Sequence, residues 1–126
     1  MIYEELNGST LAYVGDAYWS LIVRKYLISK GYTKAKDLQT KSVKFVSAKA
    51  QASFIPLFMD DLDDKQQDIF KRGRNFKSSS VPKNTDVQTY RLSTGFEAII
   101  GYLYLNEDWE KLNLIWNKVK AKMEGQ

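Results

Sequence analysis

Apolar residues recur every three or four positions along most of this 126-residue chain, a spacing that places them on one face of an α-helix. Six stretches follow this pattern: residues 11–28, 33–38, 42–54, 65–76, 93–105 and 108–123. No stretch alternates apolar and polar residues for long enough to predict a strand. The pattern therefore predicts a single all-α domain of about six helices spanning residues 1–126, with no internal repeat or linker.

Residues that favour helix ends mark several boundaries. Asn7 precedes the first stretch and Gly31 follows it, while Thr33 is a capping residue type ahead of the second. Pro56 is expected to end the third helix because proline disfavours a helical residue before it. Residues 78–85, which are rich in serine, proline and asparagine, are predicted to form a loop.

The composition excludes several kinds of chemistry. The chain contains neither cysteine nor histidine, so disulfides, thiolate sites, histidine-zinc sites and serine–histidine triads are absent. Any metal must therefore be held by oxygen ligands, which suit Mg²⁺ or Mn²⁺. The N-terminus does not look like a secretory signal, and no apolar run approaches the roughly 20 residues that span a bilayer. We expect a soluble, cytoplasmic protein that does not enter a membrane.

Positive charge is concentrated in one segment. The formal net charge is +4, and residues 65–91 alone carry seven bases against two acids, a sum of +5. Such an imbalance is typical of a surface that meets the phosphates of a nucleic acid. A solvated basic helix face without any partner would explain the charge equally well.

Two carboxylates stand alone in helices that are otherwise nearly uncharged. Asp16 is the only acid or base between residues 6 and 23, and Glu97 is the only one between residues 92 and 106. A buried carboxylate must take up a proton, pair with a base, accept hydrogen bonds or bind a cation. Each acid by itself is more simply explained as pointing outward or pairing with a distant arginine. Together with the basic segment, the two acids favour a shared divalent-metal site.

Two glycines lie close to these acids, Gly15 immediately before Asp16 and Gly101 one turn after Glu97. Glycine inside a helix costs roughly 0.5–1 kcal/mol relative to alanine, so each position needs a structural reason. Close approach of two helices would supply one, and so would close approach of a ligand. Tight packing without any chemistry explains the glycines at least as well.

Short motifs in the predicted order resemble the endonuclease domain of the ribonuclease III family. That family's signature helix carries a Gly-Asp pair, as in YVGDA at residues 13–17, and its second motif resembles FEAIIG at residues 96–101. Its intervening helix resembles VSAK at residues 46–49. The resemblance is strongest to the Mini-ribonuclease III branch, which consists of the catalytic domain without a double-stranded-RNA-binding domain. KRGRN at residues 71–75 and PKNTDVQTYR at residues 82–91 resemble that branch in particular.

This resemblance implies a homodimeric, cytoplasmic endoribonuclease that uses Mg²⁺, with Mn²⁺ as a substitute, to cleave double-stranded RNA. It further implies maturation of the 23S ribosomal RNA precursor, with a ribosomal protein as an accessory. A metal-bound water would attack the phosphodiester and leave 5′-phosphate and 3′-hydroxyl ends. The catalytic and metal-binding residues that carry over are Asp16 and Glu97, whereas two other usual carboxylates are replaced by Ala12 and Thr94.

The RNA contacts are expected in the basic segment. The candidates are Arg72, Arg74, Lys77, Lys83 and Asn84, whose guanidinium, ammonium and amide groups suit phosphates and ribose hydroxyls. Arg72, Arg74 and Lys77 could instead simply complement the dipole at a helix end.

Two other functions compete with the nuclease. One is a non-catalytic RNA-binding or ribosome-assembly module on a degenerate nuclease fold, which would tolerate loss of either acid. The other is a helical protein-interaction or DNA-binding domain with residues 65–76 as its recognition helix, which explains neither acid. A homodimer could use the aromatic residues Tyr13, Tyr18 and Trp19 of the first helix, although the core could equally well contain them.

Overall fold

Helices make up most of the chain in the computed structural model, which describes residues 1–77, 81–83 and 85–125. The described residues form six α-helices: α1 (Gly8–Ser29), α2 (Ala35–Val46), α3 (Ala48–Phe58), α4 (Asp64–Arg74), α5 (Val87–Leu105) and α6 (Trp109–Glu124). Two short 3-10 helices, η1 (Tyr3–Glu5) and η2 (Met59–Asp61), precede α1 and α4. No strand occurs in these described ranges, so the predicted all-α fold is confirmed.

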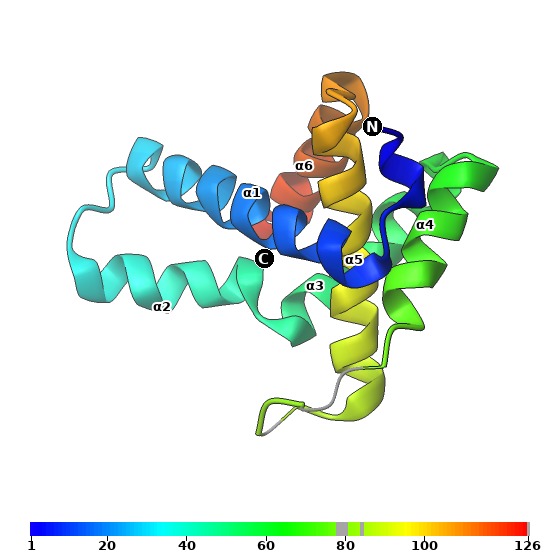
Figure 1. Cartoon of the computed structure of the whole chain (residues 1–126). Coiled ribbons are helices and arrows are strands. Elements are labelled where there is room, and N and C mark those ends of the chain that lie inside the picture. Colours follow the sequence, from blue (N-terminus) through cyan, green and yellow to red (C-terminus); the bar gives the residue numbers. More distant parts are fainter. Residues whose placement is uncertain (78–80, 84, 126) are drawn as a thin grey trace.

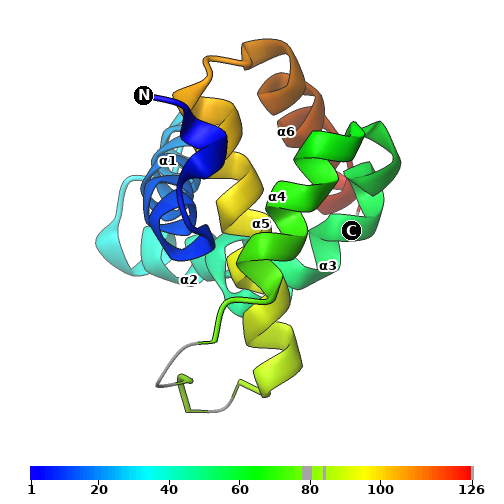
Figure 2. The same ribbon diagram turned by 45° about the vertical axis from the view of Figure 1, so that its right-hand side comes forward.

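Helix α5 runs through the middle of the molecule and packs against α1, α3, α4 and α6 (Figure 1). The view in Figure 2 shows α4 beside α5, with α1 and α6 on other sides of it. Eight residues of α5 are buried, among them Phe96, Ile99 and Ile100. The helix is apolar nearly all round because neighbouring helices cover it on several sides, as is usual for a central helix.

Aromatic side chains from several helices meet around Trp19, which is only 1% exposed. Its ring packs edge-on against Phe96 of α5 and Trp116 of α6, with centroids 4.8 and 5.4 Å away. Its indole N–H donates a hydrogen bond of 2.9 Å to the backbone carbonyl of Phe45 on α2. Trp19 therefore belongs to the core, and it is unavailable for the dimer contact that the sequence left open.

The prediction of a single helix over residues 42–54 was wrong. The chain instead breaks at Ser47, whose side chain caps α3 by accepting a hydrogen bond from the Ala50 amide. The prediction that Pro56 ends this helix was also wrong, because Pro56 lies inside α3. Helix continuation past Pro56 buries Phe58 completely, and that burial outweighs the one backbone hydrogen bond that proline cannot make.

Two helix starts also differ from expectation. Lys34, rather than Thr33, is the N-cap residue of α2, and it makes no side-chain capping bond. Helix α5 begins at Val87, six residues before the predicted start at 93, because Asp86 caps it through the Thr89 amide at 2.7 Å. Part of the predicted loop over 78–85 lies outside the described residues.

None of the helices in the part of the chain that the structure describes combines the length and apolar character needed to span a bilayer.

Candidate active site

Helices α1 and α5 cross at unusually close range, and two glycines permit the crossing. A Cβ atom built on Gly15 would lie 1.8 Å from the carbonyl oxygen of Glu97, and one built on Gly101 would lie 1.9 Å from that of Leu11. Both contacts are with backbone, which cannot move aside as a flexible side chain can. Close helix approach is therefore the reason for both glycines, as the sequence had suggested, and it places Asp16 beside Glu97.

Asp16 and Glu97 face each other across this crossing. Burial raises the pKa of Glu97 to about 9, with further upward contributions from a hydrogen bond to the Asp16 carboxyl and from the Asp16 charge. Asp16 itself lies on the exposed side of the pair. Two carboxyl groups this close cannot both ionise cheaply unless a cation joins them, so the pair is chemically suited to hold one.

A buried glutamine from a third helix completes the surroundings of Glu97. Gln51 of α3 is only 2% exposed, and its Nε2 donates to Oε2 of Glu97 at 3.3 Å. This amide favours the ionised form of Glu97 and so lowers its pKa against the larger effects of burial and Asp16. Gln51 was not predicted from the sequence, although a lone amide among the mostly apolar residues 50–58 is a usable signal.

The carboxylate cluster is small. Within the described ranges, no group of three or more aspartate, glutamate, histidine or cysteine residues lies close enough together to hold a metal. The site therefore offers two carboxylates, in agreement with the replacement of the other usual acids by Ala12 and Thr94. Mg²⁺ commonly uses one or two protein carboxylates and completes its octahedron with water and phosphate oxygens, so this donor set fits it.

The basic end of α4 packs close to the same part of α5. Gly73 lies between Arg72 and Arg74, and a Cβ there would meet the Ala98 side chain at 2.6 Å and the Thr94 carbonyl oxygen at 2.9 Å. Thr94 and Ala98 lie on either side of Glu97 in α5. The last turn of α4, which carries Arg72 and Arg74, thus packs against the part of α5 that contains Glu97.

The five predicted RNA-binding residues have different surroundings. Arg72 donates hydrogen bonds to two backbone carbonyls of the N-terminal segment, those of Glu4 and, at 2.9 Å, Leu6. Its guanidinium therefore holds the chain before α1 against α4, a role that the sequence did not indicate.

The other candidates lie further along the segment. Arg74 packs over the Phe70 ring at 5.9 Å and, with Gln88 and Arg91, lines a cavity of about 460 Å³ at the start of α5. Lys77 and Lys83 are exposed, and Asn84 lies outside the described residues.

Comparison with known proteins settles the family. The sequence profile described as Ribonuclease III domain matches residues 9–108, which include both Asp16 and Glu97. The chain belongs to the ribonuclease III family. Ribonuclease III proteins are endoribonucleases, so this chain is an endoribonuclease, and the rival expectation of a non-catalytic module is set aside.

Sequence identity to known proteins shows which branch of the ribonuclease III family this chain resembles. It is 47% identical to the Mini-ribonuclease 3 of Streptococcus pneumoniae in an alignment of 122 positions that covers 95% of each chain. It is also 47% identical to the Mini-ribonuclease 3 of Staphylococcus aureus, over 90% of this chain and 87% of that protein. The predicted similarity to the Mini-ribonuclease III branch is confirmed.

A solved structure agrees with the ribonuclease III fold. The X-ray structure of a Fusobacterium nucleatum protein superposes with a TM-score of 0.82 at 33% sequence identity. The comparison covers 96% of this chain and 94% of that protein. The arrangement of the helices around α5 is therefore shared with that protein.

Proposed function

We propose that this endoribonuclease cleaves double-stranded RNA at the Asp16–Glu97 pair with the aid of Mg²⁺, for which Mn²⁺ can substitute. The observation that carries the proposal is the contact between two carboxyl groups, one of them half-buried and shifted to a pKa of about 9. A dication between them would replace the proton that Glu97 otherwise retains, and it would leave coordination positions for water and phosphate oxygens. The catalytic domain is proposed to comprise residues 1–126.

Asp16 and Glu97 are the residues that would hold the metal. When bound, Mg²⁺ supplies Lewis-acid chemistry, which lowers the pKa of a coordinated water and neutralises charge on the scissile phosphate. Gln51 orients the Glu97 carboxylate through the hydrogen bond that its amide donates. Since the chain has no histidine, proton transfer falls to water, phosphate oxygens or the carboxylates. Hydrolysis would leave 5′-phosphate and 3′-hydroxyl ends.

The substrate proposal rests on charge as well as on family. A-form RNA is recognised through phosphates and 2′-hydroxyls across its shallow minor groove. Arg74, at the end of α4, and the exposed Lys77 and Lys83 that follow it offer cations for these phosphates. The sequence adds Asn84 as an amide donor. We propose the 23S ribosomal RNA precursor in the cytoplasm as the substrate, with a ribosomal protein as an accessory.

A homodimer is the proposed assembly, and one face of α1 supports it. Tyr13, Leu21 and Ile28 are 81%, 64% and 58% exposed, although all three are large and apolar. Their positions differ by 8 and 7 residues, which places them along one side of the helix. A second copy of the chain would cover this face through twofold symmetry and provide two catalytic sites, one for each RNA strand.

The decisive experiment is a cleavage assay on a labelled RNA duplex with and without Mg²⁺. Asp16→Asn and Glu97→Gln should each reduce cleavage by more than about 100-fold, because even groups that only orient a metal ligand contribute about 10–100-fold. Duplex binding without metal, measured by gel shift, should persist. Asp60→Asn removes an exposed carboxylate of η2 and serves as the matched control. Full activity of Asp16→Asn would reject the assignment.

A further inference from the structure

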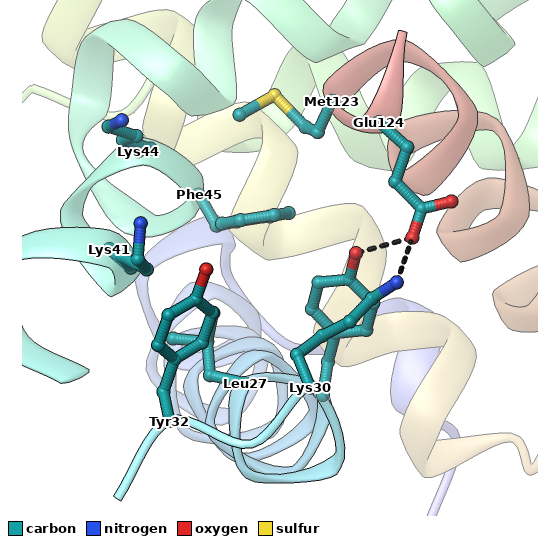
Figure 3. A pocket seen from close by; sticks show the side chains of 9 residues that line it. Leu27, Lys30, Tyr32, Lys41, Lys44, Phe45, Met123 and Glu124 are labelled. Carbon is teal, nitrogen blue, oxygen red and sulfur yellow. Dashed lines mark hydrogen bonds and ion pairs between the residues drawn. The ribbon is translucent and has the colours of Figure 1, made fainter. Parts of the chain in front are cut away.

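A second basic and aromatic pocket lies at the far end of α1, between α1, α2 and α6 (Figure 3). It has a volume of about 490 Å³, which lies within the 300–1,000 Å³ typical of small-molecule sites. Leu27, one of its lining residues, is eleven positions from Asp16 on α1, or about 16 Å along the helix axis. The pocket is therefore separate from the acidic pair.

The end of α1 builds one wall of this pocket. The helix terminates in a Schellman motif: Gly31, with φ of 97°, donates its N–H to the Ile28 carbonyl, and Tyr32 donates to the Leu27 carbonyl. The left-handed conformation at Gly31 turns the chain back on itself. The turn brings the Tyr32 ring to the pocket beside Leu27, so the aromatic wall is fixed by the backbone.

Positive charge surrounds the opening. Lys41 lies 4.6 Å from the centroid of the Tyr32 ring, and Lys44 follows one turn later on α2. On the opposite side, Lys30 pairs with Glu124 at 3.2 Å, and the Tyr26 hydroxyl also donates to Glu124 (Figure 3). The single acid of the pocket is thus neutralised.

The ammonium groups of the two α2 lysines are not neutralised by a neighbouring acid within the described part of the chain. Neither Lys41 nor Lys44 forms a salt bridge among the residues that the structure describes. The floor beneath them is apolar and aromatic, with Phe45 from α2 and Met123 from α6. Free cations above an apolar floor suit a ligand that is anionic at one end and flat and apolar at the other.

We propose that this pocket binds a nucleoside phosphate. The base takes the place of the Lys41 ammonium against the Tyr32 ring and rests on the apolar floor, and the phosphate lies between Lys41 and Lys44. The ligand chemistry is the same for a free mononucleotide and for the terminal nucleotide of an RNA strand. Aromatic side chains bind bases with little sequence preference because every base has a π-face. Lysine ammonium groups bind phosphate as mobile point charges.

The test is calorimetric titration of the full chain in EDTA with AMP, adenosine, inorganic phosphate and a 5′-phosphorylated single-stranded oligonucleotide. AMP should bind at least tenfold more tightly than either adenosine or phosphate, because only AMP engages both ends of the pocket. Tighter binding of the oligonucleotide than of AMP assigns the site to strand ends, and equal binding assigns it to free nucleotide. Phosphate binding as tight as that of AMP would overturn the proposal.

Substitutions of the two lysines test whether AMP binds in this pocket. Lys41→Gln and Lys44→Gln should each weaken AMP binding by about tenfold, as loss of a charge-assisted hydrogen bond predicts. Lys36→Gln removes an exposed lysine of α2 that does not line the pocket, and it should have no effect. Asp16→Asn should bind AMP normally, so failure of the nuclease proposal and failure of this one are distinguishable. Unchanged AMP affinity in both Lys41→Gln and Lys44→Gln would contradict the pocket assignment.

Discussion

At the scale of single residues, Glu97 is the side chain whose surroundings say most about function. An acid with a folded-state pKa of about 9 holds its proton at neutral pH, whereas in the unfolded chain the same acid ionises near 4.5. Because the two states bind different numbers of protons, the stability of the metal-free protein depends on pH. A divalent cation would take the place of that proton. Through Glu97, the stability of the folded protein should therefore depend on both pH and metal concentration.

The direction of this pH dependence follows from the raised pKa. Between about pH 4.5 and 9 the folded state carries one proton more than the unfolded state at Glu97, so its contribution to stability falls as pH rises. Glu97→Gln removes this contribution. In EDTA, the variant should gain stability over the unmodified protein as pH rises from 5 to 8, reaching about 2 kcal/mol or more. Urea denaturation at each pH measures the difference.

Binding of Mg²⁺ should stabilise the unmodified protein but not the Glu97→Gln variant. Addition of Mg²⁺ at pH 8 should raise the unfolding temperature of the unmodified protein but leave that of Glu97→Gln nearly unchanged, because binding to the native state alone stabilises it. Asp60→Asn, which alters an exposed acid, should respond like the unmodified protein. An identical Mg²⁺ response in Glu97→Gln would mean that the ion binds elsewhere.

At the scale of elements, the α1–α5 crossing fixes the relative position of the two acids. The helices touch backbone to backbone at Gly15 and Gly101, which leaves no room for side chains between them. Asp16 follows the first glycine directly, and Glu97 precedes the second by one turn. The distance between the carboxyl groups therefore depends on how closely the helices approach.

A methyl group at the crossing should disturb both stability and catalysis. Gly101→Ala would place a Cβ 1.9 Å from the Leu11 carbonyl oxygen and force α1 away from α5. We expect a loss of about 3 kcal/mol or more in the free energy of unfolding, since overpacking costs typically 1–3 kcal/mol even where side chains can adjust. Urea denaturation measures this loss.

Another glycine supplies the control for this substitution. Gly125 follows α6, and a Cβ there would lie 3.3 Å from the Ala121 carbonyl oxygen. Gly125→Ala should therefore change the free energy of unfolding by less than about 1 kcal/mol. Equal effects of Gly125→Ala and Gly101→Ala would show that the crossing is not under steric constraint.

At the scale of the whole molecule, the exposed apolar side of α1 should determine the oligomeric state. Leu21 lies between Tyr13 and Ile28 on this side and is 64% exposed. In a twofold dimer, Leu21→Glu introduces two charges into one interface, so the protein should become monomeric in light scattering. Val87→Glu changes an exposed apolar residue at the start of α5 and should leave the dimer intact. A dimeric Leu21→Glu protein would place the interface elsewhere.

The basic surface of the molecule should make RNA binding depend on salt concentration. Each phosphate contact by a cation contributes about 0.9 to the slope of log affinity against log salt concentration on duplex B-DNA, and a slope of similar size is expected for duplex RNA. Arg74→Gln combined with Lys77→Gln should therefore reduce the slope by about 1–2. Lys34→Gln with Lys36→Gln removes the same charge at the start of α2 and should not change the slope. Equal slopes for the two double variants would contradict the proposed RNA surface.

Arg72 differs from Arg74 and Lys77 because its guanidinium holds the N-terminal segment. Arg72 and Arg74 were both predicted to bind RNA because both belong to the basic segment. A count of charges along the sequence cannot distinguish a residue that binds RNA from one that makes structural hydrogen bonds. The hydrogen bonds of Arg72 to the Glu4 and Leu6 carbonyls mean that a substitution would also release the N-terminal segment. A change in RNA affinity on replacing Arg72 would therefore mix loss of charge with loss of structure.

The helical class, the family and the two acids could be recognised from the amino-acid sequence. Helical periodicity is a local property, and a carboxylate among apolar residues, such as Asp16 or Glu97, is visible without coordinates. The glycines beside them could be recognised as needing a reason because a glycine inside a helix carries a known cost. Ser47 and Asp86 were missed as helix caps because capping depends on the backbone geometry around the residue.

Which distant residues meet depends on how the helices pack in three dimensions. The contact between Asp16 and Glu97, 81 positions apart, arises from the crossing of α1 and α5, and no local pattern encodes that crossing. The same holds for Gln51, which joins the pair from α3, and for the pocket of Tyr32 and Lys41. Periodicity shows which face of a helix is apolar. The packing of whole helices, driven by burial of those faces, determines which polar groups are brought together.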